Sequence, residues 1–178
     1  MINKKQIPTN SYGILKKDTL LTSVDESAEQ VKRLGYTILD SGLTTQQIKA
    51  ISDAFNSTLL KYRKKYGDQK LKSKNEFYSI RALLSHNQDI FVKLATNKNL
   101  LALLSKLIEG KFILNQQNGI INPPKKAYNQ GSWHRDLPYQ HFVSTTPLAV
   151  NALFCVDDFT FENGSTFIIP GSHKFGNY

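Results

Sequence analysis

The chain has 178 residues, of which 40% are hydrophobic and 21% charged, proportions typical of one soluble globular domain. Its single cysteine, Cys155, excludes an internal disulfide and a cysteine-rich zinc site. Residues 1–10 show no apolar run of the signal-peptide kind, and no stretch approaches the roughly 18 consecutive apolar residues of a membrane span. We therefore expect a cytoplasmic protein without a membrane partner.

The formal net charge is +9, and the basic excess lies in the first part of the chain. Residues 1–110 hold 18 Lys and Arg against 10 Asp and Glu, whereas residues 111–178 hold 5 against 4. Much of the excess falls between Lys61 and Lys74. Such a run can recruit an anionic partner, but it lacks the interleaved aromatic residues of a base-stacking platform. We interpret it as a solvated helix end and loop, which leaves nucleic-acid binding as the least favoured function.

Helical signals dominate the first third of the chain. A polar arm leads to a short helix near Asp25–Arg33, and residues 34–39, bounded by glycines, are predicted to form a short strand. Thr44 and Gln47 form a capping box, in which each side chain can bond the other residue's exposed backbone N–H. Apolar residues then recur at steps of three and four, which predicts a helix ending near Tyr66 with this stripe in the core. The stripe consists of Ile48, Ile51, Phe55, Leu59 and Tyr62.

Two further helices are predicted after a charged, loop-like stretch at residues 67–78. They span roughly residues 87–94 and 97–108. Gly110 lies where a left-handed residue would end the second helix. His86 falls in the loop before both helices, and we interpret it as a surface or packing residue.

After Gly110 the helical period disappears, and β-branched and amide residues become frequent. Asn118-Gly119 is typical of a two-residue hairpin, but the alternation through residues 111–121 also suits one long strand, which we favour. Residues 148–156, nearly all apolar, and residues 165–169 are predicted to be further strands. Helices first and strands afterwards predict an α+β fold in a single domain, mainly helical at 1–110 and β at 111–178.

A His-x-Asp triplet, His134-Arg135-Asp136, precedes the apolar strand. In an extended backbone, residues two apart face the same side, so the imidazole and the carboxylate would converge while Arg135 points away. Two such ligands and one further histidine make the facial triad of non-haem Fe(II) oxygenases, which leaves positions open for co-substrate and O₂. A surface turn is the alternative interpretation of so short a motif.

Several short motifs follow one another in a fixed order through the second part of the chain. They are Pro123-Pro124, Trp133-His134-Arg135-Asp136-Leu137-Pro138-Tyr139, Val156-Asp157-Asp158, Glu162-Asn163-Gly164 and Ile169-Pro170-Gly171-Ser172-His173-Lys174. Their order and spacing resemble the phytanoyl-CoA dioxygenase family of Fe(II)- and 2-oxoglutarate-dependent oxygenases, well over residues 111–175 and loosely before them. The resemblance implies a double-stranded β-helix, a jelly roll of about eight strands, with iron near one mouth.

The resemblance also implies site residues and cofactors, Fe(II) and 2-oxoglutarate, and a small-molecule substrate that the sequence does not identify. By position, His134 and Asp136 are the first two iron ligands. Gln116 and Asn118 fall on the strand that lines the co-substrate pocket in the family, and Tyr139 is placed to hydrogen-bond within that pocket. Ordinary strand pairing and loop contacts are the alternative roles for these three polar residues.

One departure from the family pattern is large. The family's third ligand is a His on a late strand, and an Arg shortly after it binds the far carboxylate of 2-oxoglutarate; neither has a counterpart here. His173 is a poor substitute, because the family carries this His in a loop away from iron. We therefore expect a C-terminally truncated member that holds the first half of an incomplete jelly roll and is inactive by itself. The alternative is a non-catalytic relic or interaction protein, and the exposed strand edges of a half-barrel could pair two copies as a homodimer.

Overall fold

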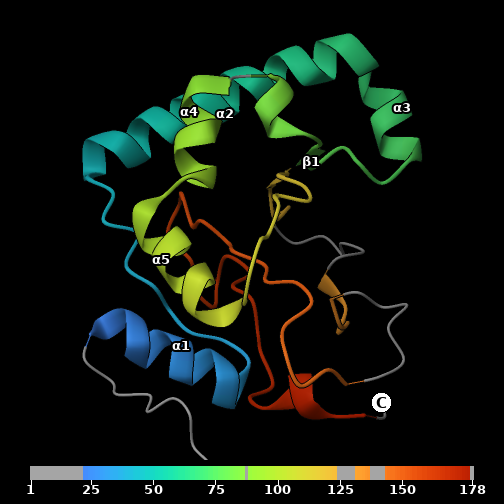
Figure 1. Ribbon diagram of the computed structural model, residues 1–178. Coiled ribbons are helices and arrows are strands. Elements are labelled where there is room, and N and C mark those ends of the chain that lie inside the picture. The colour runs from blue at the N-terminus through green and yellow to red at the C-terminus, as the bar shows by residue number, and fades with distance from the viewer. Residues whose placement is uncertain (1–21, 87, 124–130, 137–142, 177–178) are drawn as a thin grey trace, which may run out of the picture.

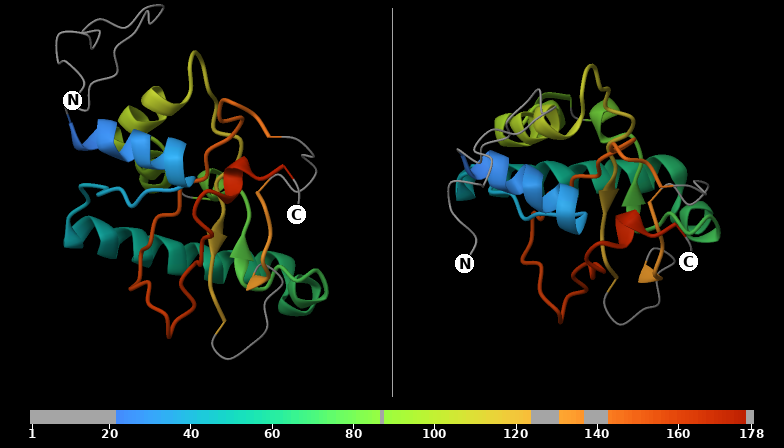
Figure 2. Two further views of the ribbon diagram at one scale, coloured as in Figure 1. Left: turned by 90° about the horizontal axis from the view of Figure 1, so that it is seen from below. Right: turned by 60° about the horizontal axis from the view of Figure 1, so that its bottom comes forward.

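The computed structural model describes residues 22–86, 88–123, 131–136 and 143–176. Figure 1 shows the helices in two groups, with α2 crossing α4 in one and α1 beside α5 in the other. The later chain runs between the groups and meets the end of α1 at residues 171–173, just before the chain ends (Figures 1 and 2). In chain order the elements are α1 (Ser23–Leu34), α2 (Thr45–Tyr66), α3 (Asp68–Ser73), β1 (Ser79–Ile80), the 3₁₀ helix η2 (Leu83–Ser85), α4 (Gln88–Ala95), α5 (Lys98–Leu107), β2 (Gly119–Ile120) and the 3₁₀ helix η4 (Ser172–Lys174).

Two apolar clusters hold these elements together. The larger joins α2, α3, α4 and β1, and its buried members are Ile51, Leu59, Tyr62, Leu71, Ile80, Leu83, Phe91 and Leu94. The smaller joins α1 to α5 through Ala28, Leu103 and Leu107. The later chain packs on both clusters, with Phe154 and Val156 against the larger and Val150 against the smaller.

The sequence predicted α1 and α2 correctly. Thr44 accepts the backbone N–H of Gln47, and the side chain of Gln47 accepts the backbone N–H of Thr44 at 2.8 Å, so the expected capping box is present. The same reciprocal pair, between Thr22 and Asp25, begins α1. Because each cap pairs two backbone N–H groups that the helix leaves unsatisfied, both starts are defined locally.

The structure corrects two predictions in the helical part. The strand predicted at residues 34–39 is absent. Leu34 ends α1, residues 36–39 belong to no helix or strand, and Ile38 is 91% exposed, because no other strand of the described residues lies alongside to pair with them. The predicted loop at residues 67–78 contains α3, whose Leu71 is buried in the larger cluster. The burial of Leu71 therefore stabilises α3, although the charged residues around it predicted a loop.

The helices α4 and α5 agree with the prediction. Asn97 caps α5 by accepting the backbone N–H of Leu100 at 3.0 Å. Gly110 has a φ of 90°, although Ile108 is the residue that ends the helix. His86 packs edge-on against the Tyr62 ring with the ring centroids 5.5 Å apart, so it is the packing residue that we expected.

The long strand predicted at residues 111–121 is reduced to β2. This strand pairs antiparallel with β1, with Ser79 opposite Ile120 and Ile80 opposite Gly119. Asn118-Gly119 therefore makes no hairpin, since the partner strand lies earlier in the chain. An added Cβ at Gly119 would overlap the Phe55 ring, so the absence of a side chain lets β2 pack against α2.

Residues 148–156 and 165–169, also predicted as strands, form no β-ladder. Leu148, Leu153 and Phe167 are about as exposed as surface residues, at 58%, 60% and 58%. A strand needs a neighbour for its backbone hydrogen bonds, and the part of the chain that the structure describes offers these segments none. Helices followed by extended chain agree with the α+β order, but the described residues do not form the predicted jelly roll.

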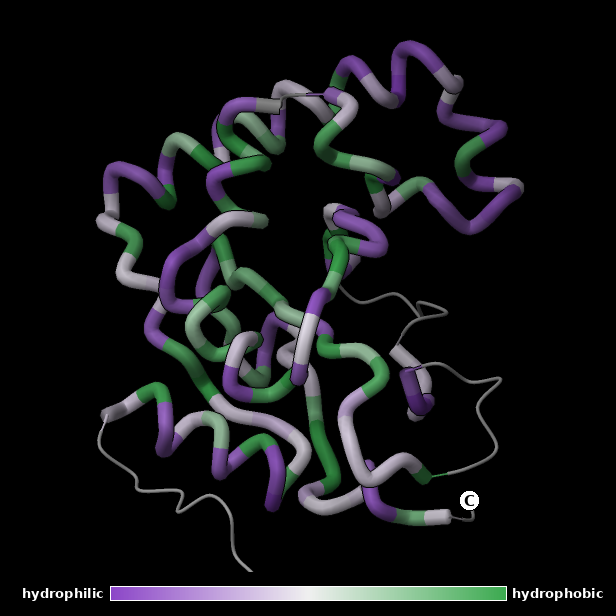
Figure 3. The backbone as a smooth tube through the Cα atoms, in the orientation of Figure 1, coloured by the Kyte–Doolittle hydropathy of each residue, from purple (hydrophilic) through white to green (hydrophobic). Residues whose placement is uncertain are grey.

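The basic run from Lys61 to Lys74 extends from the C-terminal part of α2 through α3 to its C-cap, at the end of the molecule that is coloured mostly hydrophilic in Figure 3. Basic side chains at the end of α2 complement the partial negative charge of its last carbonyl groups. Arg63 and Lys72 both lie over the Phe77 ring, at 4.0 and 4.9 Å from its centroid. Among the described residues no helix is long and apolar enough to cross a membrane.

Candidate metal centre

The side chains of His134 and Asp136 converge, as the alternation of an extended backbone predicts. Residues 132–136 belong to no helix or strand, and Nε2 of His134 lies 3.8 Å from Oδ1 of Asp136. The two side chains are 57% and 66% exposed, so as an ion pair they contribute at most about 1 kcal/mol. The pair therefore matters for the chemistry of its two donor atoms, not for stability.

A backbone carbonyl fixes the tautomer of His134. Nδ1 of the ring lies 2.8 Å from the carbonyl oxygen of Ser132. A carbonyl can only accept a hydrogen bond, so Nδ1 carries the proton and donates it. In the neutral ring with this tautomer, Nε2 carries no proton and faces Asp136, and this is the form of imidazole that binds a metal ion.

An amide side chain holds Asp136 in a similar way. Nδ2 of Asn151 donates to Oδ2 of Asp136 at 3.2 Å, which leaves Oδ1 facing His134. Asn151 comes from the apolar segment 148–156, 15 residues later in the chain. Sequence reasoning missed this partner, and the only signal for it was one amide inside an apolar run.

Arg135 joins the candidate site to the last described segment. Its Nη2 donates to the carbonyl oxygen of Phe175 at 2.6 Å. Arg135 is half-buried, whereas the other residues of the segment 131–136 are exposed. The side chain between the two candidate ligands thus anchors the segment that carries them.

His173 lies at helix α1 and not with His134 and Asp136. Nε2 of His173 is 3.1 Å from the carbonyl oxygen of Lys32, and the backbone N–H of Gly171 donates to the carbonyl of Leu34 at 2.7 Å. No group of three His, Cys, Asp or Glu side chains that could hold a metal ion forms within residues 22–86, 88–123, 131–136 and 143–176.

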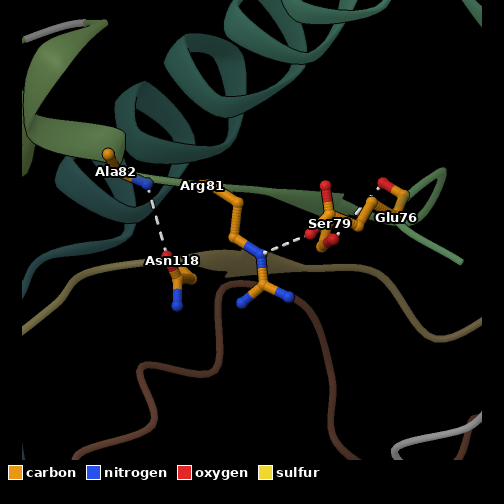
Figure 4. A network of polar contacts seen from close by, with 5 residues as sticks. All are labelled: Glu76, Ser79, Arg81, Ala82 and Asn118. Atoms are coloured by element: carbon orange, nitrogen blue, oxygen red, sulfur yellow. Dashed lines mark hydrogen bonds and ion pairs between the residues drawn. The ribbon is translucent and has the colours of Figure 1, made fainter. Parts of the chain in front are cut away.

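Two of the three polar residues expected in a co-substrate pocket, Asn118 and Gln116, belong to the part of the chain that the structure describes. Oδ1 of Asn118 accepts the backbone N–H of Ala82 at 3.3 Å, next to an Arg81–Glu76 ion pair (Figure 4), so Asn118 makes the loop contact that was its alternative role. Gln116 is exposed. Tyr139 lies outside the described residues.

Gln117 is a polar residue of this segment that the sequence did not single out. Its Nε2 donates to the carbonyl oxygen of Phe91 at 3.0 Å, and its backbone carbonyl accepts the N–H of Leu83 at 2.9 Å. These two bonds tie the chain before β2 to α4 and η2. The role of Gln117 is therefore structural.

The residues present fit two of the three protein ligands of an iron centre. Nε2 of His134 and Oδ1 of Asp136 are separated by less than two metal–ligand bonds of about 2.1 Å each, so one ion can contact both. Imidazole with carboxylate is the donor set that non-haem Fe(II) oxygenases use. The described residues contain no third ligand beside them.

Comparisons with known proteins place the chain in a family. A model described as Phytanoyl-CoA dioxygenase (PhyH) matches residues 31–178. Uncharacterized protein Rv1501 of Mycobacterium tuberculosis and Uncharacterized protein Mb1539 of Mycobacterium bovis are each 25% identical to the chain over 158 residues. That match covers 86% of this chain and 57% of each relative, so the chain spans just over half of the relatives' length. No solved structure matches significantly. Because the family match extends over most of its residues, the chain belongs to the phytanoyl-CoA dioxygenase family.

Proposed function

We propose that this chain carries part of the active site of an Fe(II)- and 2-oxoglutarate-dependent dioxygenase that hydroxylates a small molecule. The observation that supports the proposal best is the distance of 3.8 Å between His134 Nε2 and Asp136 Oδ1. The other polar atom of each side chain is hydrogen-bonded, to Ser132 and to Asn151 respectively. Membership of the family adds the oxygenase class. Iron bound with 2-oxoglutarate and O₂ supplies the oxidising power to hydroxylate an unactivated C–H bond.

The residues of the chain bind and orient. His134 binds as the neutral imidazole, with Nδ1 donating a hydrogen bond to the carbonyl oxygen of Ser132. Asp136 contributes the negative charge that offsets the charge of the metal ion. Asn151 directs the free carboxylate oxygen to the same point as the ring nitrogen. Both ligands are open to solvent, so co-substrate and O₂ can reach the remaining positions.

We place the remaining parts of the active site outside the described residues. His173 is bonded to the backbone of α1, so it is not our choice for the third ligand. The family's late-strand His and carboxylate-binding Arg have no counterpart among the 178 residues. Tyr139 and Gln116 remain our candidates for the co-substrate pocket. For Asn118 the contact with Ala82 favours the structural role.

Calorimetric titration with Co(II), a redox-stable surrogate of Fe(II), tests the metal site. We expect weak binding to the 178-residue chain, because two protein ligands leave the other positions to water. His134→Ala and Asp136→Ala should each abolish it. Asp157→Ala is the matched control, since it removes an exposed carboxylate elsewhere and should leave the affinity unchanged. Equal loss of binding in Asp157→Ala, or full binding in both ligand variants, would refute the proposed site.

A second candidate function is that of an interaction protein that keeps part of the fold and pairs with a second copy of itself. Exposed apolar side chains in the later chain favour it, among them Leu153 at 60% and Phe161 at 75%. Sedimentation analysis distinguishes the two candidates. A monomer that binds Co(II) supports the oxygenase proposal, and a stable dimer without metal binding supports the second candidate.

A further inference from the structure

The structure links the segment of the candidate metal ligands to helix α1 through a chain of contacts. We propose that the Pro-Gly-Ser-His turn at residues 170–173 is a strap, and that His173 and Arg135 are positioning residues that hold the His134–Asp136 segment in place. This inference rests on the proposed metal site for its consequence, but its contacts are independent of any metal ion.

The first contact fixes the turn to the end of α1. The last carbonyl groups of a helix have no partner inside the helix. Here the N–H of Gly171 donates to the carbonyl of Leu34 at 2.7 Å, and Nε2 of His173 lies 3.1 Å from the carbonyl of Lys32. The His173 ring rests on Gly35, where an ideal Cβ would come within 2.6 Å of Nδ1, so glycine at that position admits the ring. Figure 2 shows η4 beside this end of α1.

Backbone hydrogen bonds within the strap define its local shape. Residues 172–174 form the 3₁₀ helix η4, with Gly171 in the left-handed conformation at its start. The N–H groups of Lys174 and Phe175 donate to the carbonyls of Gly171 and Ser172, both at 3.0 Å. The position of the Phe175 carbonyl is therefore determined by where His173 and Gly171 are bonded.

The second contact joins the Phe175 carbonyl to the His134–Asp136 segment. Nη2 of Arg135 donates to the Phe175 carbonyl at 2.6 Å, a short bond from a charged donor. Arg135 lies between the two candidate ligands in the sequence. A fixed Arg135 side chain therefore restricts the backbone from which His134 and Asp136 extend. Residues 132–136 have no ladder of backbone hydrogen bonds to hold them, which gives this anchor its importance.

The test measures the His134 ring in the metal-free protein and the Co(II) affinity in parallel. In the wild-type chain the ¹⁵N resonances of His134 should report a protonated Nδ1, because Ser132 accepts its proton. His173→Ala and Arg135→Met should both shift these resonances toward the average of free imidazole and weaken Co(II) binding by a few-fold to about tenfold, the effect of one lost hydrogen bond. His173→Gln and Arg135→Lys, which keep a donor, should restore part of both signals.

The matched control is His86→Ala, which removes a histidine packed on Tyr62 and remote from the strap. It should lower thermal stability without moving the His134 resonances. If His173→Ala and Arg135→Met lower stability alone, and leave both the ring resonances and the Co(II) affinity unchanged, the strap is merely structural and the inference is overturned. If His134→Ala retains Co(II) binding, the proposed metal site fails, and the ring resonances of the metal-free protein still decide whether the strap positions the segment.

Discussion

The contacts behind His134 and Asp136 determine how well two exposed side chains can bind a metal ion. Ser132 contributes a backbone carbonyl, which substitution leaves in place, whereas Asn151 contributes a side chain that can be removed. Hydrogen-bonded partners of metal ligands are worth about 10–100-fold in metal affinity. Among the direct partners of the two ligands, Asn151 is thus the one whose side chain can be removed without touching either ligand.

We expect Asn151→Ala to weaken Co(II) binding to the chain by about 10–100-fold. Asn151 is exposed, so the free energy of unfolding should change by less than about 0.5 kcal/mol. Calorimetric titration measures the affinity and urea denaturation the stability. Asn115→Ala, which removes another exposed amide, should leave the affinity as it is. Equal affinities for wild type and Asn151→Ala would show that Asp136 does not need this partner.

Glu162 is a residue whose ionisation is coupled to its turn. A hydrogen bond from its own backbone, and then one from the side chain of Thr160, lower the pKa of Glu162 from its ordinary value. Because the folded pKa is lowered, the ionised carboxylate stabilises the turn above the ordinary pKa, and this contribution is lost as the pH falls through the lowered value.

Thr160→Val removes one of the two donors and should raise the pKa of Glu162 toward its ordinary value. An NMR titration of the Glu162 carboxyl carbon measures the midpoint directly. Thr166→Val, a similar change at an exposed position in the same region, should leave the midpoint in place. An unaltered midpoint in Thr160→Val would mean that the backbone bond alone lowers the pKa.

At the residue scale, the sequence predicted the pair of candidate ligands but not what holds them. An extended backbone brings residues two apart to the same face whatever surrounds them, so the approach of His134 to Asp136 was predictable. Asn151 and Phe175 meet the segment only through folding of distant chain, which no local pattern encodes. An amide within the apolar residues 148–156 was the one available signal, since a polar group there needs a partner.

Helices were more predictable than strands for the same physical reason. The start of α2 depends on Thr44 and Gln47, three residues apart, and its apolar stripe repeats within one element. By contrast, β2 depends on β1, whose residues lie about 40 positions earlier, and residues 148–156 depend on neighbours that the described chain does not provide. The helix α3 was missed because a single buried side chain, Leu71, supports it.

The short β1–β2 pair offers a sharp steric prediction. Gly119→Ala adds a methyl group that would overlap the Phe55 ring, and overpacking of this kind costs about 1–3 kcal/mol in the free energy of unfolding. The cost should fall in a Phe55→Leu background, where the ring edge is absent, so the two substitutions should be coupled in a double-mutant cycle. Urea denaturation measures all four proteins.

Gly131→Ala is the matched control for this cycle. An added Cβ at Gly131 would meet nothing within 4 Å of the described atoms, so the substitution should be nearly neutral. If Gly119→Ala were as harmless as Gly131→Ala, then α2 and β2 would not pack as closely as the structure shows.

At the scale of the whole molecule, the chain combines a helical part that contains the buried core with an extended part that contains the proposed metal ligands. Both apolar clusters have their buried residues in α1–α5 and the short segments between them, whereas residues 143–176 contribute partly buried side chains at their edges. Phe161, Phe167 and Ile169 remain exposed. In a jelly roll such as the resemblance implies, these residues would be covered on both faces. The exposed apolar surface is therefore what we expect of segments that lack neighbouring strands.

The last prediction concerns turnover by the 178-residue chain. We expect it to form no measurable succinate from 2-oxoglutarate with Fe(II) and ascorbate, with a family member that carries the late-strand His and the following Arg as positive control. Two reasons act separately. Iron held by His134 and Asp136 alone is poorly fixed, and 2-oxoglutarate without a guanidinium partner loses charge-assisted hydrogen bonds worth about 1.5–3 kcal/mol each.

His173→Ala serves as an internal check on this prediction, because that side chain is bonded to Lys32 and not to the metal segment. Turnover at the rate of the positive control would contradict the prediction. If that turnover then disappeared in His173→Ala even with saturating Fe(II), which offsets the weaker metal binding expected from loss of the strap, His173 would have to leave α1 and bind the metal ion during the reaction. If it persisted in His173→Ala and grew with protein concentration, the missing ligand would come from a second copy of the chain.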